Sequence, residues 1–121
     1  MTPEQAALIE RLRALLADEP VVREVSMFGG RSVMVNEKMI VSALKDGGLL
    51  VRVDSVQHAE LLARPGAMQA EMGPGRDMGP GRDMGPGWIE VAAEAIEGGD
   101  QLAAWVRIAM DYNRHVTGGH P

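Results

Sequence analysis

The chain opens with apolar residues at the spacing of one face of a helix. Thr2 can cap this helix, because Pro3 suits the first helical position and Gln5 stands three residues after the cap. The pattern predicts a helix that ends before Pro20. Its apolar face consists of Leu8, Ile9, Leu12, Leu15 and Leu16.

Four short runs rich in β-branched residues follow, and turn residues separate them. The separators are Gly29-Gly30, Asn36-Glu37-Lys38 and Asp46-Gly47-Gly48. Connections this short cannot form a parallel crossover, so consecutive strands are expected to pair antiparallel. The runs predicted as strands are residues 21–28, 32–36, 39–45 and 49–53.

The second half of the chain predicts a helix, two strands and a last helix. The short helix opens at Asp54 or Ser55 and ends at Pro65-Gly66, and Gly98-Gly99-Asp100 caps the last helix. The two strands between them are residues 67–72 and 88–92. An apolar face at helical spacing marks the last helix: Leu102, Trp105, Val106, Ala109 and Tyr112.

The predicted order is therefore α-β-β-β-β-α-β-β-α. We expect one α+β domain over residues 1–121, with an antiparallel sheet of about five to six strands and the helices on one face. The pairing of the last two strands with the other four stays open. The other face of the sheet is expected to be solvated or to meet a partner. Residues 115–121 are expected to be a flexible tail.

Composition and charge narrow the classes of function. The 121 residues include no cysteine, which excludes disulfides and thiolate metal ligands. The net charge is −5 with no basic cluster, which argues against direct nucleic-acid binding. No apolar run has the ~20 residues needed to cross a bilayer, and the N-terminus lacks the features of a signal peptide, so we expect a cytoplasmic protein without a membrane partner.

No catalytic constellation is visible in the sequence. His58, His115 and His120 are scattered, and the last two are not at the i, i+4 spacing that places two imidazoles on one helix face. The serines have no neighbouring motif that would activate them. We therefore predict no catalytic residue, no metal site and no cofactor, and favour a protein that is not an enzyme.

Residues 72–87 contain a repeat, Met-Gly-Pro-Gly-Arg-Asp, present twice in full and once in part. Gly-Pro-Gly favours turns, so the favoured interpretation is a surface loop lengthened by duplication. A second interpretation is an anion- or partner-binding loop that uses Arg76 and Arg82. A third treats the methionines as Cu(I) ligands. Those three methionines are Met72, Met78 and Met84.

Several stretches, in order, resemble the N-terminal domain of the TfoX/Sxy family, bacterial proteins linked to control of natural competence. They extend over about residues 6–114. The strongest is Met27-Phe28-Gly29-Gly30-Arg31, and Gly87-Trp88 resembles the family's entry into a strand. Val51-Arg52-Val53-Asp54 and Leu102-Ala103-Ala104-Trp105-Val106 match further along. The signature residues are interpreted as structural: Met27, Phe28, Gly29, Gly30, Gly87 and Trp88.

The resemblance implies a protein-interaction module, an accessory regulator of transcription or competence that acts through a protein partner. A homodimer is also expected. The alternative is a small-ligand or anion-binding protein that uses Arg31, Arg76 or Arg82. Two departures stand out: family regulators join this domain to a C-terminal helical domain that is not expected here, and the glycine-rich segment carries an extra hexapeptide.

Overall fold

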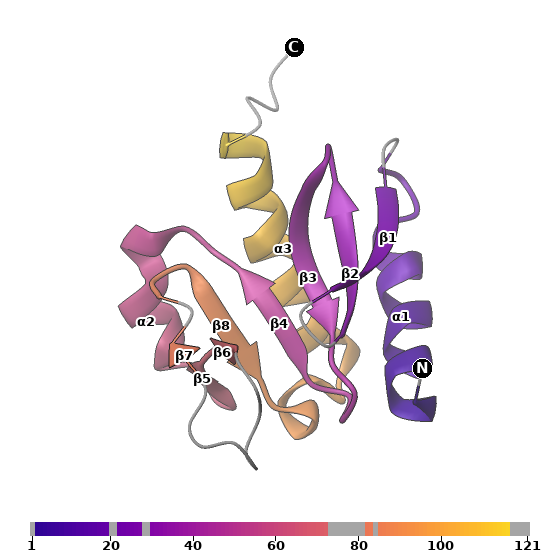
Figure 1. Ribbon diagram of the computed structural model, residues 1–121, viewed down its shortest axis with the longest axis horizontal. Coiled ribbons are helices and arrows are strands. Elements are labelled where there is room, and N and C mark those ends of the chain that lie inside the picture. The colour runs from indigo at the N-terminus through magenta and orange to yellow at the C-terminus, as the bar shows by residue number, and fades with distance from the viewer. Residues whose placement is uncertain (1, 20–21, 28–29, 73–81, 84, 117–121) are drawn as a thin grey trace.

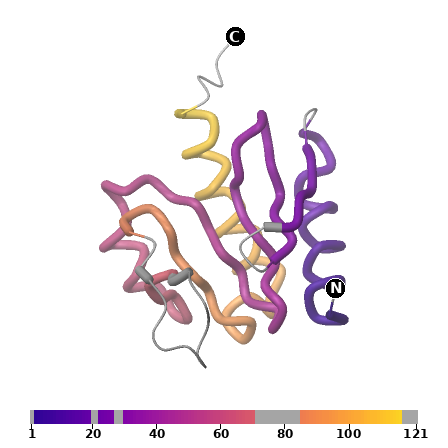
Figure 2. The backbone as a smooth tube through the Cα atoms, in the orientation of Figure 1, coloured from indigo at the N-terminus to yellow at the C-terminus, as the bar shows by residue number. Residues whose placement is uncertain are grey.

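A computed structural model describes residues 2–19, 22–27, 30–72, 82–83 and 85–116, with the backbone alone at positions 27, 71–72 and 82–83. Figures 1 and 2 show the arrangement of the chain. In order, the elements are α1 (Pro3–Leu15), β1 (Val22–Met27), β2 (Gly30–Val35), β3 (Lys38–Ala43), β4 (Leu49–Arg52), η1 (Ser55–Gln57), α2 (His58–Leu62), β5 (Ala67–Gln69), β6 (Glu71–Met72), β7 (Arg82–Asp83), β8 (Trp88–Val91), η3 (Ala93–Ile96) and α3 (Gly99–Val116).

The six-stranded sheet is antiparallel throughout and has the order β1-β2-β3-β4-β8-β5. The first four strands form the predicted meander. The last strand of the chain, β8, then lies between β4 and β5, which settles the pairing that the sequence left open. The predicted α+β class, strand count and element order are confirmed.

Because successive side chains of a strand point to opposite sides of the sheet, the sheet has two different faces. One row that crosses the sheet is Val33, Val41, Val51 and Ile89, which pair in that order and are at most 3% exposed. The next row, on the opposite face, begins with Ser32 and Ser42, whose hydroxyls lie 3.1 Å apart. In that second row Ser32 and Ser42 are buried, whereas Met68 on β5 is 44% exposed.

All three helices lie on the apolar face, as predicted. The helix α3 packs on β3 and β4, α1 on β2 and β3, and α2 on β5 and β8, and Figure 1 shows α3 passing behind the centre of the sheet. Leu102, Trp105 and Ala109 of α3 are each at most 3% exposed, so they fill the core together with the valine row. Burial of this continuous apolar layer is the main force that holds the helices to the sheet.

The start of α1 follows the sequence prediction in detail. The Gln5 backbone N–H donates to Oγ1 of Thr2, and the Thr2 N–H donates to Oε1 of Gln5, which forms a capping box. Nε2 of Gln5 also donates to the Ala43 carbonyl at 2.8 Å, so the cap joins α1 to β3. One predicted apolar position is wrong: Leu15 ends the helix and is 43% exposed.

Other differences concern the ends of elements. The single strand expected over residues 67–72 is interrupted at Ala70: β5 pairs with β8, whereas β6 pairs with β7 in a separate two-stranded sheet. Between β8 and α3 the chain forms η3, a short 3₁₀-helix absent from the sequence prediction. The helix α3 runs to Val116 and so includes two residues of the expected tail. No helix in the described part of the chain is long and apolar enough to cross a membrane.

Candidate functional site

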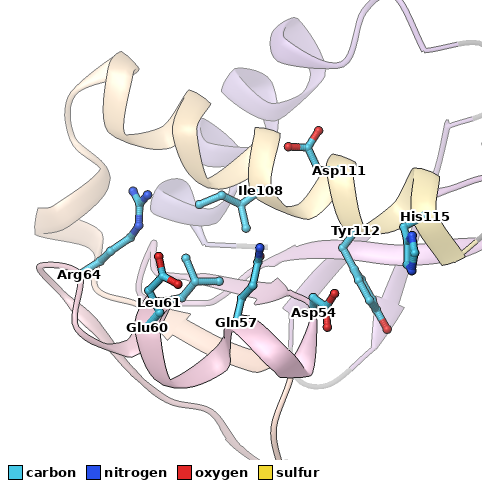
Figure 3. Close-up of a pocket in the computed structure, with 9 residues that line it drawn as sticks. All are labelled: Asp54, Gln57, Glu60, Leu61, Arg64, Ile108, Asp111, Tyr112 and His115. Atoms are coloured by element: carbon cyan, nitrogen blue, oxygen red, sulfur yellow. The ribbon is translucent and has the colours of Figure 1, made fainter.

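A groove of about 280 Å³ lies between the η1–α2 segment and α3 (Figure 3). Leu61, which is 5% exposed, and the half-buried Ile108 supply its apolar floor. Figure 3 shows Gln57 and Leu61 pointing from one wall toward Ile108 on the other. A groove between two helices with an apolar floor can receive the side chains of an extended or helical segment.

Carboxylates dominate the rim of this groove. Asp54, Glu60 and Asp111 line it, together with one guanidinium, that of Arg64, and the imidazole of His115. Glu60 and Asp111 are exposed and come from different walls. The groove therefore presents negative charge on both sides of an apolar floor, which favours a positively charged occupant.

Local hydrogen bonds and ring contacts hold the rim residues in place. Oδ1 of Asp54 accepts from the Val56 N–H at 3.0 Å and so caps η1, a 3₁₀ turn at the place where the sequence predicts that the short helix opens. The Arg64 guanidinium lies 5.6 Å from the ring centre of Trp105, so a cation–π contact ties it to α3. Asp111 forms a 3.7 Å ion pair with Arg114, one turn further along α3. Asp54 and Arg64 therefore have fixed positions, whereas the Glu60 carboxylate forms no ion pair with any residue that the structure describes.

A buried histidine fixes the wall that carries α2. His58 is 9% exposed; its Nδ1 accepts from the Gly87 N–H at 2.9 Å, and its Nε2 lies 2.7 Å from Oε1 of Gln69. These bonds join α2 to the start of β8 and to β5. The buried imidazole therefore has a structural role in the fold.

Arg31, the first predicted binding residue, lies on the helix-covered face near the β1 edge. Its Nε is 3.5 Å from Oε1 of Glu24, and its Nη1 donates to Oγ of Ser26 at 3.3 Å. Glu24 also accepts two hydrogen bonds from Arg13 of α1. The Arg13 guanidinium holds the pKa of the Glu24 carboxyl below its usual range; burial opposes this, and Arg31 adds a smaller lowering. Arg31 is therefore occupied in joining β2 to β1 within an ion-pair cluster.

The two other predicted arginines belong to the repeat. Arg82 lies in β7, opposite Met72 of β6, and only its backbone is described. Arg76 lies outside the described residues. The strand β6 continues from β5, at the opposite edge of the sheet from β1, as Figure 1 shows. Arg31 and Arg82 therefore do not meet in one site.

The first signature stretch lies at the β1–β2 connection. Met27 ends β1 and pairs with Gly30, which begins β2, while Phe28 and Gly29 lie outside the described residues. A Cβ atom on Gly30 would come within 2.7 Å of the Ala43 carbonyl oxygen and of Oγ of Ser42. Only glycine fits this close approach, which supports a structural role for that position.

The second signature, Gly87-Trp88, lies beside a stack of three side chains. The Arg52 guanidinium is 4.8 Å from the ring centre of Trp88 and 5.2 Å from that of Tyr112. Its Nη2 also donates to the Tyr112 hydroxyl at 3.3 Å. Gly87 has φ +98°, and a Cβ there would come within 2.5 Å of Nη1 of Arg52, so this glycine makes room for the stack.

Sequence reasoning missed the groove because its residues are far apart along the chain. The sequence predicts Asp54 at the start of a short helix and Tyr112 on the apolar face of the last helix, and it assigns neither residue to a site. The i, i+3 and i, i+4 spacing of Ile108, Asp111 and Tyr112 could have indicated one face of α3. Nothing in the sequence says that α2 faces it. In the described part of the chain, no three His, Asp or Glu residues are grouped to hold a metal ion.

These observations define a class: an α+β domain with three helices on one face of a six-stranded antiparallel sheet, and a polar groove between two of them. The sequence matches the TfoX N-terminal domain over residues 14–112, so the chain belongs to that family. The family is linked to the regulation of competence. Comparison with curated proteins gives no significant match.

Proposed function

We propose that this chain is a protein-interaction module that regulates transcription or competence through a protein partner. We further propose that the groove between α2 and α3 receives a positively charged segment of that partner. The observation that carries the proposal is the charge of the groove, where three carboxylates and one guanidinium surround an apolar floor.

The charge of the whole chain supports the same choice of partner. With a net charge of −5, long-range attraction favours a basic protein surface and disfavours phosphate backbones. A second copy of the chain would bring its own excess of negative charge, so a homodimer through this groove is less favoured than a basic partner. Apolar side chains of the partner would bury Leu61 and Ile108, while its Lys or Arg residues would meet Glu60 and Asp111.

In the test, three tagged proteins are used to recover partners from a lysate of the source organism, and mass spectrometry identifies the partners. The three proteins are the unaltered chain, a groove variant and a matched control. The groove variant is Glu60→Lys with Asp111→Lys, at two exposed positions on opposite walls. The matched control is Asp18→Lys with Glu97→Lys, also exposed and outside the groove, which changes the net charge equally.

A transcription factor or polymerase subunit that binds the unaltered chain and the control, and is lost with the groove variant, would support the proposal. Its binding should also weaken as salt rises, because exposed charges are screened. Equal recovery by all three proteins would contradict the assignment of the groove. If the groove variant instead abolishes a dimer seen by light scattering, the occupant is a second copy.

A further inference from the structure

We propose that a second cavity, on the other side of Tyr112 from the groove, binds a small organic anion with a carboxylate group and an apolar body. The cavity has a volume of about 280 Å³. It lies where the first residues of β3 and β8 and the end of β4 face the last turns of α3. Its volume is near the lower end of the range for small-molecule sites, so the ligand is small.

The charge of this cavity is opposite to that of the protein. Among the residues that the structure describes, Lys38 and Arg52 line it and no aspartate or glutamate does. Within the described residues, neither cation is in an ion pair, whereas Arg13, Arg23, Arg31 and Arg114 pair with glutamates. Two uncompensated cations at one cavity of a chain with net charge −5 indicate a site for an anion.

Contacts within the protein already fix the position of the Arg52 guanidinium. Its guanidinium contacts the rings of Trp88 and Tyr112, which restricts its rotation, and one N–H already donates to the Tyr112 hydroxyl. A guanidinium has five N–H donors in a planar fork that matches a carboxylate. Lys38 follows a tight turn in which Asn36 and Glu37 have φ values of 54° and 68°, and this turn brings Lys38 to the lining of the same cavity.

Apart from Asn113, whose amide nitrogen donates to the Val35 carbonyl, the rest of the described lining is apolar or aromatic. Met39, Ala109 and Val116 contribute aliphatic surface, next to the ring of Trp88. An inorganic ion would leave this surface in contact with water, whereas an apolar body on the ligand would bury it. Two cations together with this apolar and aromatic surface therefore favour a carboxylate with a small hydrocarbon or aromatic body.

The test is titration of the ¹⁵N-labelled chain with benzoate, with benzamide as the neutral probe of the same shape. The chain has two tryptophans, so Trp88→Phe assigns the two indole N–H signals. Trp88 lines the cavity, and Trp105 is 3% exposed in the core and outside this cavity. We expect benzoate to shift the Trp88 signal at concentrations on the order of 1–10 mM and benzamide to shift it much less.

Lys38→Gln should weaken benzoate binding about tenfold, the loss expected for one charge-assisted hydrogen bond. Lys45→Gln, at another exposed lysine outside the cavity, should leave it unchanged. Arg52→Lys, which keeps the charge but not the planar fork, should also weaken it. Equal binding of benzoate and benzamide, or equal effects of the two lysine variants, would overturn the proposal. Because the readout is ligand binding, it is independent of partner recovery through the groove.

Discussion

The Nδ1 atom of His58 accepts a hydrogen bond from the backbone N–H of Gly87, 2.9 Å away. Since Nδ1 is the acceptor, the ring carries its proton on Nε2 and donates it to Oε1 of Gln69. This buried imidazole thereby joins α2 to the start of β8 and keeps one wall of the acidic groove in place.

Replacement of His58 by leucine should destabilise the chain by about 1–3 kcal/mol, because the buried Gly87 N–H loses its acceptor. His58→Asn is the matched variant, since its side-chain oxygen can take the position of Nδ1, and it should recover part of the loss. Urea denaturation of both variants measures the difference. Equal stability of the leucine variant and the unaltered chain would show that this bond contributes little.

Gly87→Ala should be more damaging than Gly85→Ala. Both glycines have positive φ, +98° and +89°, so both substitutions incur a backbone penalty of about 1–2 kcal/mol. The two positions differ in the room for a side chain. A Cβ on Gly85 would have no atom within 4 Å, whereas a Cβ on Gly87 would collide with Arg52. Thermal unfolding should therefore show a larger loss for Gly87→Ala, and near-ultraviolet circular dichroism should show an altered Trp88–Arg52–Tyr112 stack. Equal losses would mean that Arg52 moves aside freely.

Glu24→Gln should lower the free energy of unfolding at pH 7 by about 0.5–1 kcal/mol, the range of a surface ion pair with good geometry. The pKa of Glu24 is lowered in the folded chain, chiefly by Arg13. Its stabilisation is therefore complete above the ordinary glutamate pKa and is lost as the pH falls through the lowered value. The two stability curves should converge at acidic pH.

The control for that measurement is Glu10→Gln. Glu10 also pairs with Arg13, at 2.6 Å, but its side chain is 72% exposed. This substitution should change stability less than Glu24→Gln at neutral pH. A Glu24→Gln difference that persists unchanged at acidic pH would contradict the ion-pair explanation.

Deletion of Met78–Asp83 should leave the six-stranded sheet intact. Neither β8 nor β5 includes a residue of the deleted unit, and Arg76-Asp77 would then precede Met84 as Arg82-Asp83 does now. Because closure entropy changes slowly with loop length, stability should change by no more than about 1 kcal/mol. Urea denaturation and amide protection of β8 measure this. Loss of protection at β8 would show that the repeat supports the sheet.

Most of the fold could be predicted because it depends on local patterns. The Thr2–Gln5 capping box and the short polar turns between strands specify α1 and the meander without reference to distant residues. The insertion of β8 between β4 and β5 depends on long-range pairing, which periodicity does not encode. For the same reason the break at Ala70, where the chain changes pairing partner, was not visible in the sequence.

The candidate sites were much harder to predict. The groove joins Asp54 and Glu60 to Asp111, and the second cavity joins Lys38 to Arg52 and Tyr112. Each set becomes one surface only after α3 has packed on the sheet. The family resemblance makes Arg31 a candidate binding residue, whereas the fold places it in a cluster with Glu24.

The hexapeptide repeat has a consequence for how the gene can change. In the pairing of β6 with β7, Glu71 lies opposite Asp83 and Met72 lies opposite Arg82. Each full copy of the repeat ends in Arg-Asp, so a chain with one, two or more full copies has Arg-Asp just before Met84. In-frame duplication or loss of a unit would then alter the reach of this segment while preserving the strand register on both sides. Natural variants of different copy number should therefore be tolerated by the six-stranded sheet, because none of its strands includes a residue of the repeated unit Met78–Asp83.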